Sequence, residues 1–201
     1  MSLRNTFGLL YEPEQQWQKI SEKNDSIVKT YFKFLVVMAL IPPSAAFVGS
    51  TYVGWSLSFT EETQRLTVDS ALKLSIAAYF AILAAVFALA AFIHWMARTY
   101  GSSPSMKRCM NLAAYSCTPL FLVSVFGAYP ILWMDMLLSL VAIAWAVYLL
   151  YTGVPIMMGI DKERGFMFAG SIITACMCIL VGMLAVTVIF WGSGLAPAFT
   201  S

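Results

Sequence analysis

Between Asp135 and Asp161 the chain reads MLLSLVAIAWAVYLLYTGVPIMMGI, residues 136–160, and this run of 25 residues carries no charge. A helix needs about 20 apolar residues to cross roughly 30 Å of hydrocarbon. The run is therefore long enough for one crossing of a bilayer and too short for two. It predicts a membrane-spanning helix.

Four other charge-free runs flank this one, after Lys33, Lys73, Arg108 and Arg164, and each holds between 24 and 37 residues. Transmembrane barrels would instead show alternating strands of about ten residues. We therefore predict an all-α polytopic membrane protein, a bundle of five transmembrane helices with a short N-terminal amphipathic helix. The expected spans lie near 32–54, 73–97, 106–126, 131–152 and 166–191.

Composition supports a membrane protein. Of 201 residues, 60% are hydrophobic and 11% are charged, whereas soluble domains carry roughly 25% charged residues. The mean hydropathy is +0.79. These values exclude a soluble enzyme, a disordered chain and a nucleic-acid binder with a basic face.

The distribution of Lys and Arg predicts the orientation, because cytoplasmic loops carry the excess of these residues. With alternating loops, ten of the 12 basic residues fall on one side. Only Arg65 and Lys73 fall on the other. We expect a cytoplasmic N-terminus and a C-terminus outside. The expected parts are a cytoplasmic tail with an interfacial helix over residues 1–31, a five-helix transmembrane domain over 32–192, and a short outer tail over 193–201.

Small residues recur at spacings of four and three in the second and fifth predicted spans. Such residues let helices approach closely in a membrane, so both stripes are expected to face other helices. The stripes consist of Ala77, Ala81, Ala84, Ala88 and Ala91, and of Ser171, Ala175, Cys178, Gly182 and Ala185.

Proline interrupts the first span at Pro42 and Pro43 and the third at Pro119. A proline inside a helix leaves the carbonyl four residues earlier without its amide partner; for Pro119 this is the carbonyl of Tyr115. We expect kinks whose free carbonyls are satisfied by neighbouring helices. A broken-helix site for an ion or substrate is the alternative. Pro155 is expected just past the fourth helix.

The residue types needed for catalysis or metal binding are scarce. Nucleophilic catalysis needs a base and an orienting group, and the spans offer only His94 and Asp135, which the predicted topology places at opposite membrane faces. Zinc needs several converging ligands. Cys176 and Cys178 point about 200° apart on a helix, so they do not both reach one Cu(I) ion. We expect no catalytic, cofactor or metal site, and no enzymatic activity.

The N-terminal tail is the richest polar segment. Pro13 can open a helix on which Trp17 and Ile20 lie together. An amphipathic helix lying on the inner leaflet is one expectation. A segment that docks a membrane or cytoplasmic protein partner is the other, with Tyr11, Pro13 and Trp17 as its contact surface.

Several stretches together resemble the YIP (Ypt-interacting protein) family, and most of all its short bacterial inner-membrane members. They are Tyr11-Glu12-Pro13 with Trp17, Ala114-Tyr115 followed by Pro119, and Tyr148-Leu149-Leu150-Tyr151-Thr152-Gly153 with Lys162. The resemblance covers nearly the whole chain. It implies that 32–192 is a YIP-like domain in which Tyr115, Pro119, Tyr151 and Gly153 shape the bundle.

Eukaryotic members of that family are implied to be scaffolds for small Rab-type GTPases, through a tail motif of aspartate, leucine, tyrosine, glycine and proline. The nearest stretch here, Leu9-Leu10-Tyr11-Glu12-Pro13, lacks the aspartate and the glycine. We predict a non-enzymatic scaffold of a bacterial inner membrane that contacts lipids and proteins, without nucleic acid. The alternative is a small channel or transporter acting as a homodimer.

Overall fold

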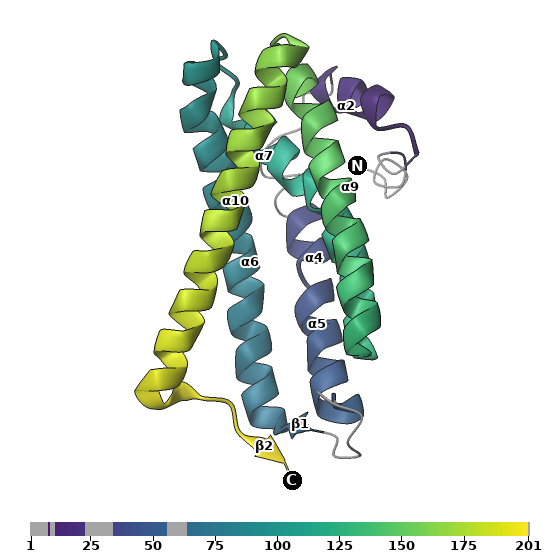
Figure 1. Cartoon of the computed structure of the whole chain (residues 1–201), viewed down its shortest axis with the longest axis vertical. Coiled ribbons are helices and arrows are strands. Elements are labelled where there is room, and N and C mark those ends of the chain that lie inside the picture. The colour runs from purple at the N-terminus through teal and green to yellow at the C-terminus, as the bar shows by residue number, and fades with distance from the viewer. Residues whose placement is uncertain (1–7, 9–10, 23–33, 56–63, 201) are drawn as a thin grey trace.

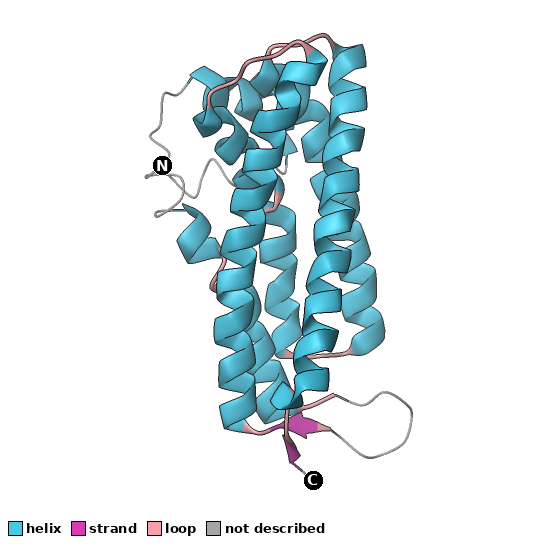
Figure 2. Cartoon of the chain, turned by 90° about the vertical axis from the view of Figure 1, so that its left-hand side faces the viewer, coloured by secondary structure: helices cyan, strands magenta, loops and turns pink. Residues whose placement is uncertain are grey.

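The computed structural model describes residue 8 and residues 11–22, 34–55 and 64–200. The basic residues Arg4, Lys23, Lys29 and Lys33 of the predicted cytoplasmic tail lie outside these ranges. Nearly all of the described chain is helical (Figure 2). Its elements are α2 (Pro13–Glu22), α4 (Val36–Met38), α5 (Ile41–Val48), η2 (Gly49–Val53), β1 (Arg65–Leu66), α6 (Val68–Met96), η3 (Ala97–Tyr100), α7 (Met106–Ser116), α8 (Thr118–Val123), η4 (Ser124–Ala128), α9 (Leu132–Met158), α10 (Lys162–Phe190), η5 (Trp191–Leu195) and β2 (Phe199–Thr200).

Five helical segments of the described chain are long and apolar enough to cross a membrane, which confirms the predicted all-α, five-helix architecture; the amphipathic nature of the N-terminal helix stays a prediction. They run side by side as a bundle, with α6, α9 and α10 as its long members and α2 packed beside one end (Figure 1). The segments are Val36–Val53, Val68–Tyr100, Met106–Ala128, Leu132–Met158 and Lys162–Ser193.

The first span is broken between α4 and α5, and Pro42 and Pro43 stand in the first turn of α5. Two hydroxyls of α6 reach carbonyls near this break. Tyr79 Oη donates to the Val36 carbonyl at 3.3 Å, and Ser75 Oγ donates to the Pro43 carbonyl at 3.2 Å. The break is thus a kink supported by its neighbour, because backbone groups need internal partners in hydrocarbon.

The third span is also broken, at Cys117, between α7 and α8, with Pro119 in the first turn of α8. Proline removes the amide that would pair with the Tyr115 carbonyl. That carbonyl instead accepts the Cys117 amide. The span ends in the 3₁₀ segment η4.

The two broken spans pack against each other through glycine. A Cβ added to Gly49 would collide with the backbone carbonyl of Gly127 and would lie 3.2 Å from Cδ of Pro130. Only a residue without a side chain allows this close approach of two backbones.

Helix α9 continues through Pro155 to Met158, so the prediction that this proline lies beyond the helix was wrong. Gly159, at φ +66°, ends the helix, and its amide donates to the Pro155 carbonyl at 2.9 Å. The proline ring fits because α10 presents Gly165, where an added Cβ would lie 2.6 Å from Pro155 Cγ.

The hydrophobic core lies toward the end of the bundle that holds α2 and α7. It joins α2 with α7, α9, the end of α6 and the beginning of α10. Its largest fully buried side chains include Trp17, Tyr115, Phe168, Leu35, Ile93 and Met110. The buried residues of α10 all lie at or before Ile172, and α10 leans away from α6 beyond that point (Figure 1).

The two small-residue stripes are largely uncovered within the single chain. Ala77, Ala84 and Ala88 are exposed on α6, and Cys178, Gly182 and Ala185 are exposed on α10. Within one copy of the chain these positions are not covered by other helices, so the prediction that both stripes face other helices, in the chain or in an oligomer, stays a prediction. The spacing indicates a helix face, but it does not indicate whether lipid or protein covers that face.

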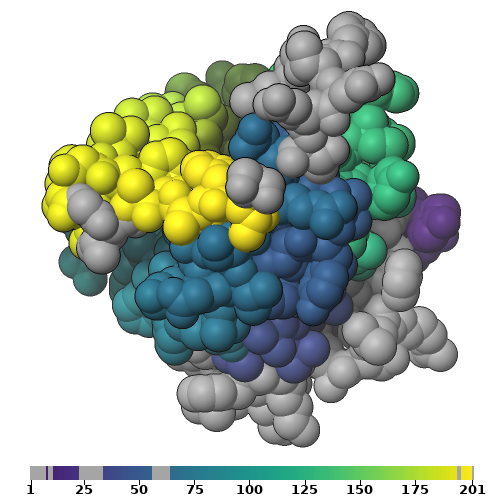
Figure 3. Space-filling model, turned by 90° about the horizontal axis from the view of Figure 1, so that it is seen from below, coloured from purple at the N-terminus to yellow at the C-terminus, as the bar shows by residue number. Residues whose placement is uncertain are grey.

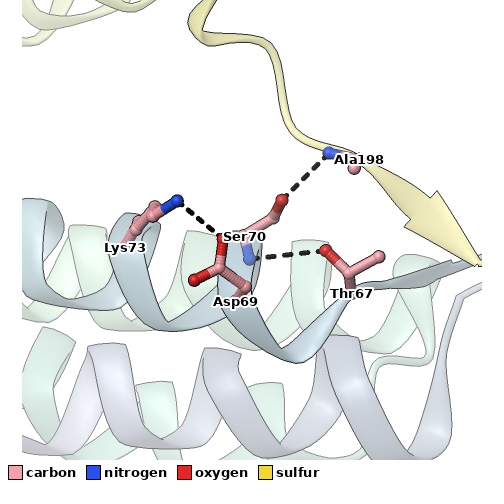
Figure 4. A network of polar contacts seen from close by, with 5 residues as sticks. All are labelled: Thr67, Asp69, Ser70, Lys73 and Ala198. Carbon is pink, nitrogen blue, oxygen red and sulfur yellow. Dashed lines mark hydrogen bonds and ion pairs between the residues drawn. The ribbon is translucent and has the colours of Figure 1, made fainter.

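The C-terminal residues return to the bundle and close its far end. Strand β2 pairs antiparallel with β1, with Arg65 opposite Thr200 and Leu66 opposite Phe199. The Ala198 amide donates to Ser70 Oγ at 3.1 Å, in the first turn of α6 (Figure 4). We call residues 196–200 the C-terminal strap. Seen from this end, the yellow C-terminal segment lies against the blue residues at the beginning of α6 (Figure 3).

Candidate functional site

Two of the three predicted contact residues of the tail, Pro13 and Trp17, lie on helix α2, which packs against α9 (Figure 1). Pro13, Trp17 and Ile20 share one face of α2 and are buried. The exposed fraction of Trp17 is 0%. Trp17 and Pro13 therefore contact the chain's own bundle.

Gly153 of α9 is the position that receives the indole. A Cβ at Gly153 would lie 2.7 Å from Cε2 and 2.9 Å from Cζ2 of Trp17, and 2.9 Å from Cδ1 of Leu112. Real side-chain contacts do not come that close, so only glycine leaves room for the ring. The structure thus joins a tail residue and a bundle residue that the sequence analysis had placed in separate groups.

Tyr11 differs from its two neighbours, because 86% of its side chain is exposed. It directly precedes the docked helix, two residues before Pro13. Of the three predicted contact residues, Tyr11 is the one whose side chain is free of the core.

Tyr115 and Pro119 flank the break in the third span. Tyr115 is 1% exposed, and its ring lies 4.5 Å from the ring of Phe34, centroid to centroid. Pro119 is buried in the first turn of α8. Tyr115 thus packs against Phe34, which precedes the first span, and the predicted role of both residues in shaping the bundle stays a prediction.

Tyr151 lies on a different side of α9 from Gly153. Its ring stacks on Phe166 of α10 with centroids 4.8 Å apart and planes 26° apart. The contact ties α9 to the beginning of α10 at the surface of the bundle, since 63% of the Phe166 side chain is exposed.

A cavity of about 420 Å³ opens near the middle of the bundle, between α5, α6, α8 and α10. Its walls are apolar except for the Ser124 hydroxyl and two thiols. Those thiols are Cys117, at the break in the third span, and Cys176 of α10. Sequence analysis did not predict that these two thiols share a cavity, since the two cysteines are far apart in the chain and only the folded bundle brings them together.

The groups considered for chemistry stay apart. His94 is near the end of α6, where Nδ1 lies 3.1 Å from the Pro104 carbonyl. Asp135 is in the first turn of α9, at the opposite end of the bundle (Figure 1). Within the described ranges, no three His, Cys, Asp or Glu residues come together as metal ligands.

Comparison with known proteins gives the family. The model of the Yip1 domain matches residues 7–183. Inner membrane protein YohC of Escherichia coli strain K12, and the same-named protein of Escherichia coli O6:H1 strain CFT073, are each 37% identical over 193 residues, which cover 96% of this chain and 98% of the relative. No solved structure matches. The predicted resemblance is confirmed, and the chain belongs to the Yip1 family.

Proposed function

We propose that this protein is a non-enzymatic scaffold of a bacterial inner membrane, which acts by contacting lipids and other membrane proteins. The inner-membrane location is supported by the name of the E. coli relatives. We also propose the orientation given by the basic residues, with the N-terminus in the cytoplasm.

One observation carries the proposal. The cavity near the middle of the bundle is walled almost entirely by hydrocarbon, with Ser124 as its hydroxyl. A path for ions or polar solutes needs hydrogen-bonding groups along it, and this cavity does not supply them. An apolar cavity suits lipid contact.

The alternative, a channel or transporter, has one observation in its favour. Three oxygens of the third span, on Asn111, Ser116 and Thr118, are buried without a hydrogen-bond partner in the described part of the chain. Buried polar atoms usually have a partner, and a polar solute passing the break would supply one.

Flux through proteoliposomes separates the two functions. We expect vesicles that contain the protein to leak ions and small polar solutes no faster than empty vesicles. Flux above that background, abolished by Thr118→Val, would refute the scaffold and establish the channel. The variant replaces the hydroxyl with a methyl group of similar volume.

The tail supplies the protein-contact part of the proposal. Deletion of residues 1–12 removes Tyr11 but leaves Pro13–Glu22 to dock on α9. With a photoreactive amino acid at position 11, we expect crosslinks to a membrane or cytoplasmic protein. The matched control places the same group at Gln15, which is exposed on α2. Equal crosslinking from both positions would show that the Tyr11 surface is not the contact.

A further inference from the structure

Two cavities follow one another along the face of α10 that is turned toward α6. The first is the apolar cavity described above, whose α10 wall includes Cys176 and Met183. The second has a volume of about 470 Å³, and its α10 wall includes Thr187 and Phe190. Residues three or four apart lie on the same face of a helix, and Met183 and Thr187 are one turn apart. The two cavities therefore lie in line on one face of α10, and we call them together the α6–α10 groove.

The α6–α10 groove is polar at one end and apolar at the other. Ser70, Lys73 and Thr187 line the end near the C-terminal strap. The Lys73 ammonium lies 2.6 Å from the Asp69 carboxylate, and 74% of the Lys73 side chain is exposed. An ammonium group has three donors, so this contact leaves others available for a second anion (Figure 4).

The length of the groove matches one leaflet of a bilayer. From Cys176 to Phe190 the α10 wall rises about 21 Å at 1.5 Å per residue. One leaflet contributes roughly 15 Å of hydrocarbon, and the rest of the groove reaches the headgroup region. Phe190 and Trp191 line the same end as Lys73, and aromatic residues are enriched at the membrane–water interface.

Charge decides between a lipid and a second copy of the chain as the occupant. The exposed part of α10 carries no charged residue after Arg164. If the α10 of another copy lay in the groove, its apolar surface would cover the Lys73–Asp69 ion pair and supply no hydrogen-bonding group to either residue. A phospholipid places a phosphate at the lysine and hydrocarbon in the apolar part.

We propose that the α6–α10 groove binds one glycerophospholipid. Its phosphate contacts Lys73 and Ser70, and one acyl chain extends along α10 to the cavity beside Leu89 and Phe121. The C-terminal strap covers the headgroup end through Ala196 and Pro197. This inference rests on the proposed lipid-contacting role and adds the lipid class, the position and the orientation.

Photolabelling tests the position of the acyl chain. The full-length protein is placed in vesicles of phosphatidylethanolamine and phosphatidylglycerol that contain a trace of phosphatidylethanolamine with a diazirine halfway along one acyl chain. Mass spectrometry then locates the labelled peptides. We expect label to concentrate on residues 82–89 and 176–183, which line the inner half of the groove.

Matched variants test the groove itself. Ala85→Phe fills it, whereas Ala84→Phe adds the same ring at the neighbouring exposed position, which lines no part of it. Label on the groove peptides should fall severalfold in the first variant only. Lys73→Gln should lower the lipid retained in native mass spectrometry about fivefold, the effect expected of one lysine at a membrane surface, and Lys162→Gln should not.

Two results would overturn the proposal. One is label spread evenly over the exposed faces of the wild-type protein, including Leu140 and Ile143 on α9. The other is a lipid-free dimer crosslinked through α10 of both copies. The distribution of label on the wild-type protein tests whether lipid occupies the groove even if Ala85→Phe does not fold. If the groove binds no lipid, the result of the flux test is unaffected. Flux of ions or polar solutes through the vesicles would refute the proposed function, whatever the groove binds.

Discussion

The contact between Trp17 and Gly153 gives the sharpest test of how the tail helix is held. Replacement of Gly153 by alanine puts a Cβ 2.7 Å from the indole. Overpacking of this kind costs about 1–3 kcal/mol. Alanine in a helix gains about 1 kcal/mol over glycine. We therefore expect Gly153→Ala to lower the free energy of unfolding by up to about 2 kcal/mol.

The effect of Gly153→Ala on the free energy of unfolding should change once the Trp17 indole is removed. Trp17→Ala alone should cost about 3–5 kcal/mol, as for other buried tryptophans. In that background the main collision at Gly153 is absent, and the contact that remains is with Cδ1 at the end of the Leu112 side chain. Gly153→Ala should then be neutral or stabilise the protein by up to about 1 kcal/mol.

Unfolding in mixed detergent micelles, followed by circular dichroism, measures all four members of this double-mutant cycle. Gly170→Ala on α10 is the matched control, because an added Cβ meets nothing within 4 Å there, and we expect it to be neutral or slightly stabilising. If Gly153→Ala had the same effect with and without Trp17, the docking of α2 on α9 would be refuted.

One more substitution and one crosslinking experiment test other parts of the bundle. Gly49→Ala should prevent the first and third spans from packing, because its Cβ would meet the Gly127 carbonyl; the readout is the yield of monodisperse protein, and a yield equal to that of the wild type would contradict the close approach. Cys117 and Cys176 line one cavity, so a short membrane-permeant reagent with two thiol-reactive groups should link them within one chain. Mass spectrometry should show no link from Cys117 to Cys178, which is exposed. A link of that kind would contradict the placement of Cys117 and Cys176 in one cavity.

The number of spans was predictable because it depends on where charges lie, and the cost of burying a charge in hydrocarbon leaves little choice. Helix ends were less predictable. Helix α9 passes through Pro155 because Gly165 of another helix leaves room for the ring. Such an accommodation depends on a partner that is not local in the sequence.

The candidate site, too, was predictable from the sequence only in part. Pro13, Trp17 and Ile20 have helical spacing, so their common face could be read from the sequence. The surface that this face covers could not be read from the sequence, because Gly153 is remote in the chain and marks the docking site only by lacking a side chain. The mid-bundle cavity was also beyond prediction, since its walls come from four helices.

The pairing of β1 with β2 has a consequence for biogenesis. It joins Arg65 of the first loop to Thr200, which follows the fifth span, so the first loop cannot pair with its partner strand until all five spans have been synthesised. Chains fold largely from the N-terminus during synthesis, and this pairing is therefore a late event. A bulky reporter placed directly after β2 would burden the segment that completes the pairing, whereas a fusion at the N-terminus leaves the pairing unhindered.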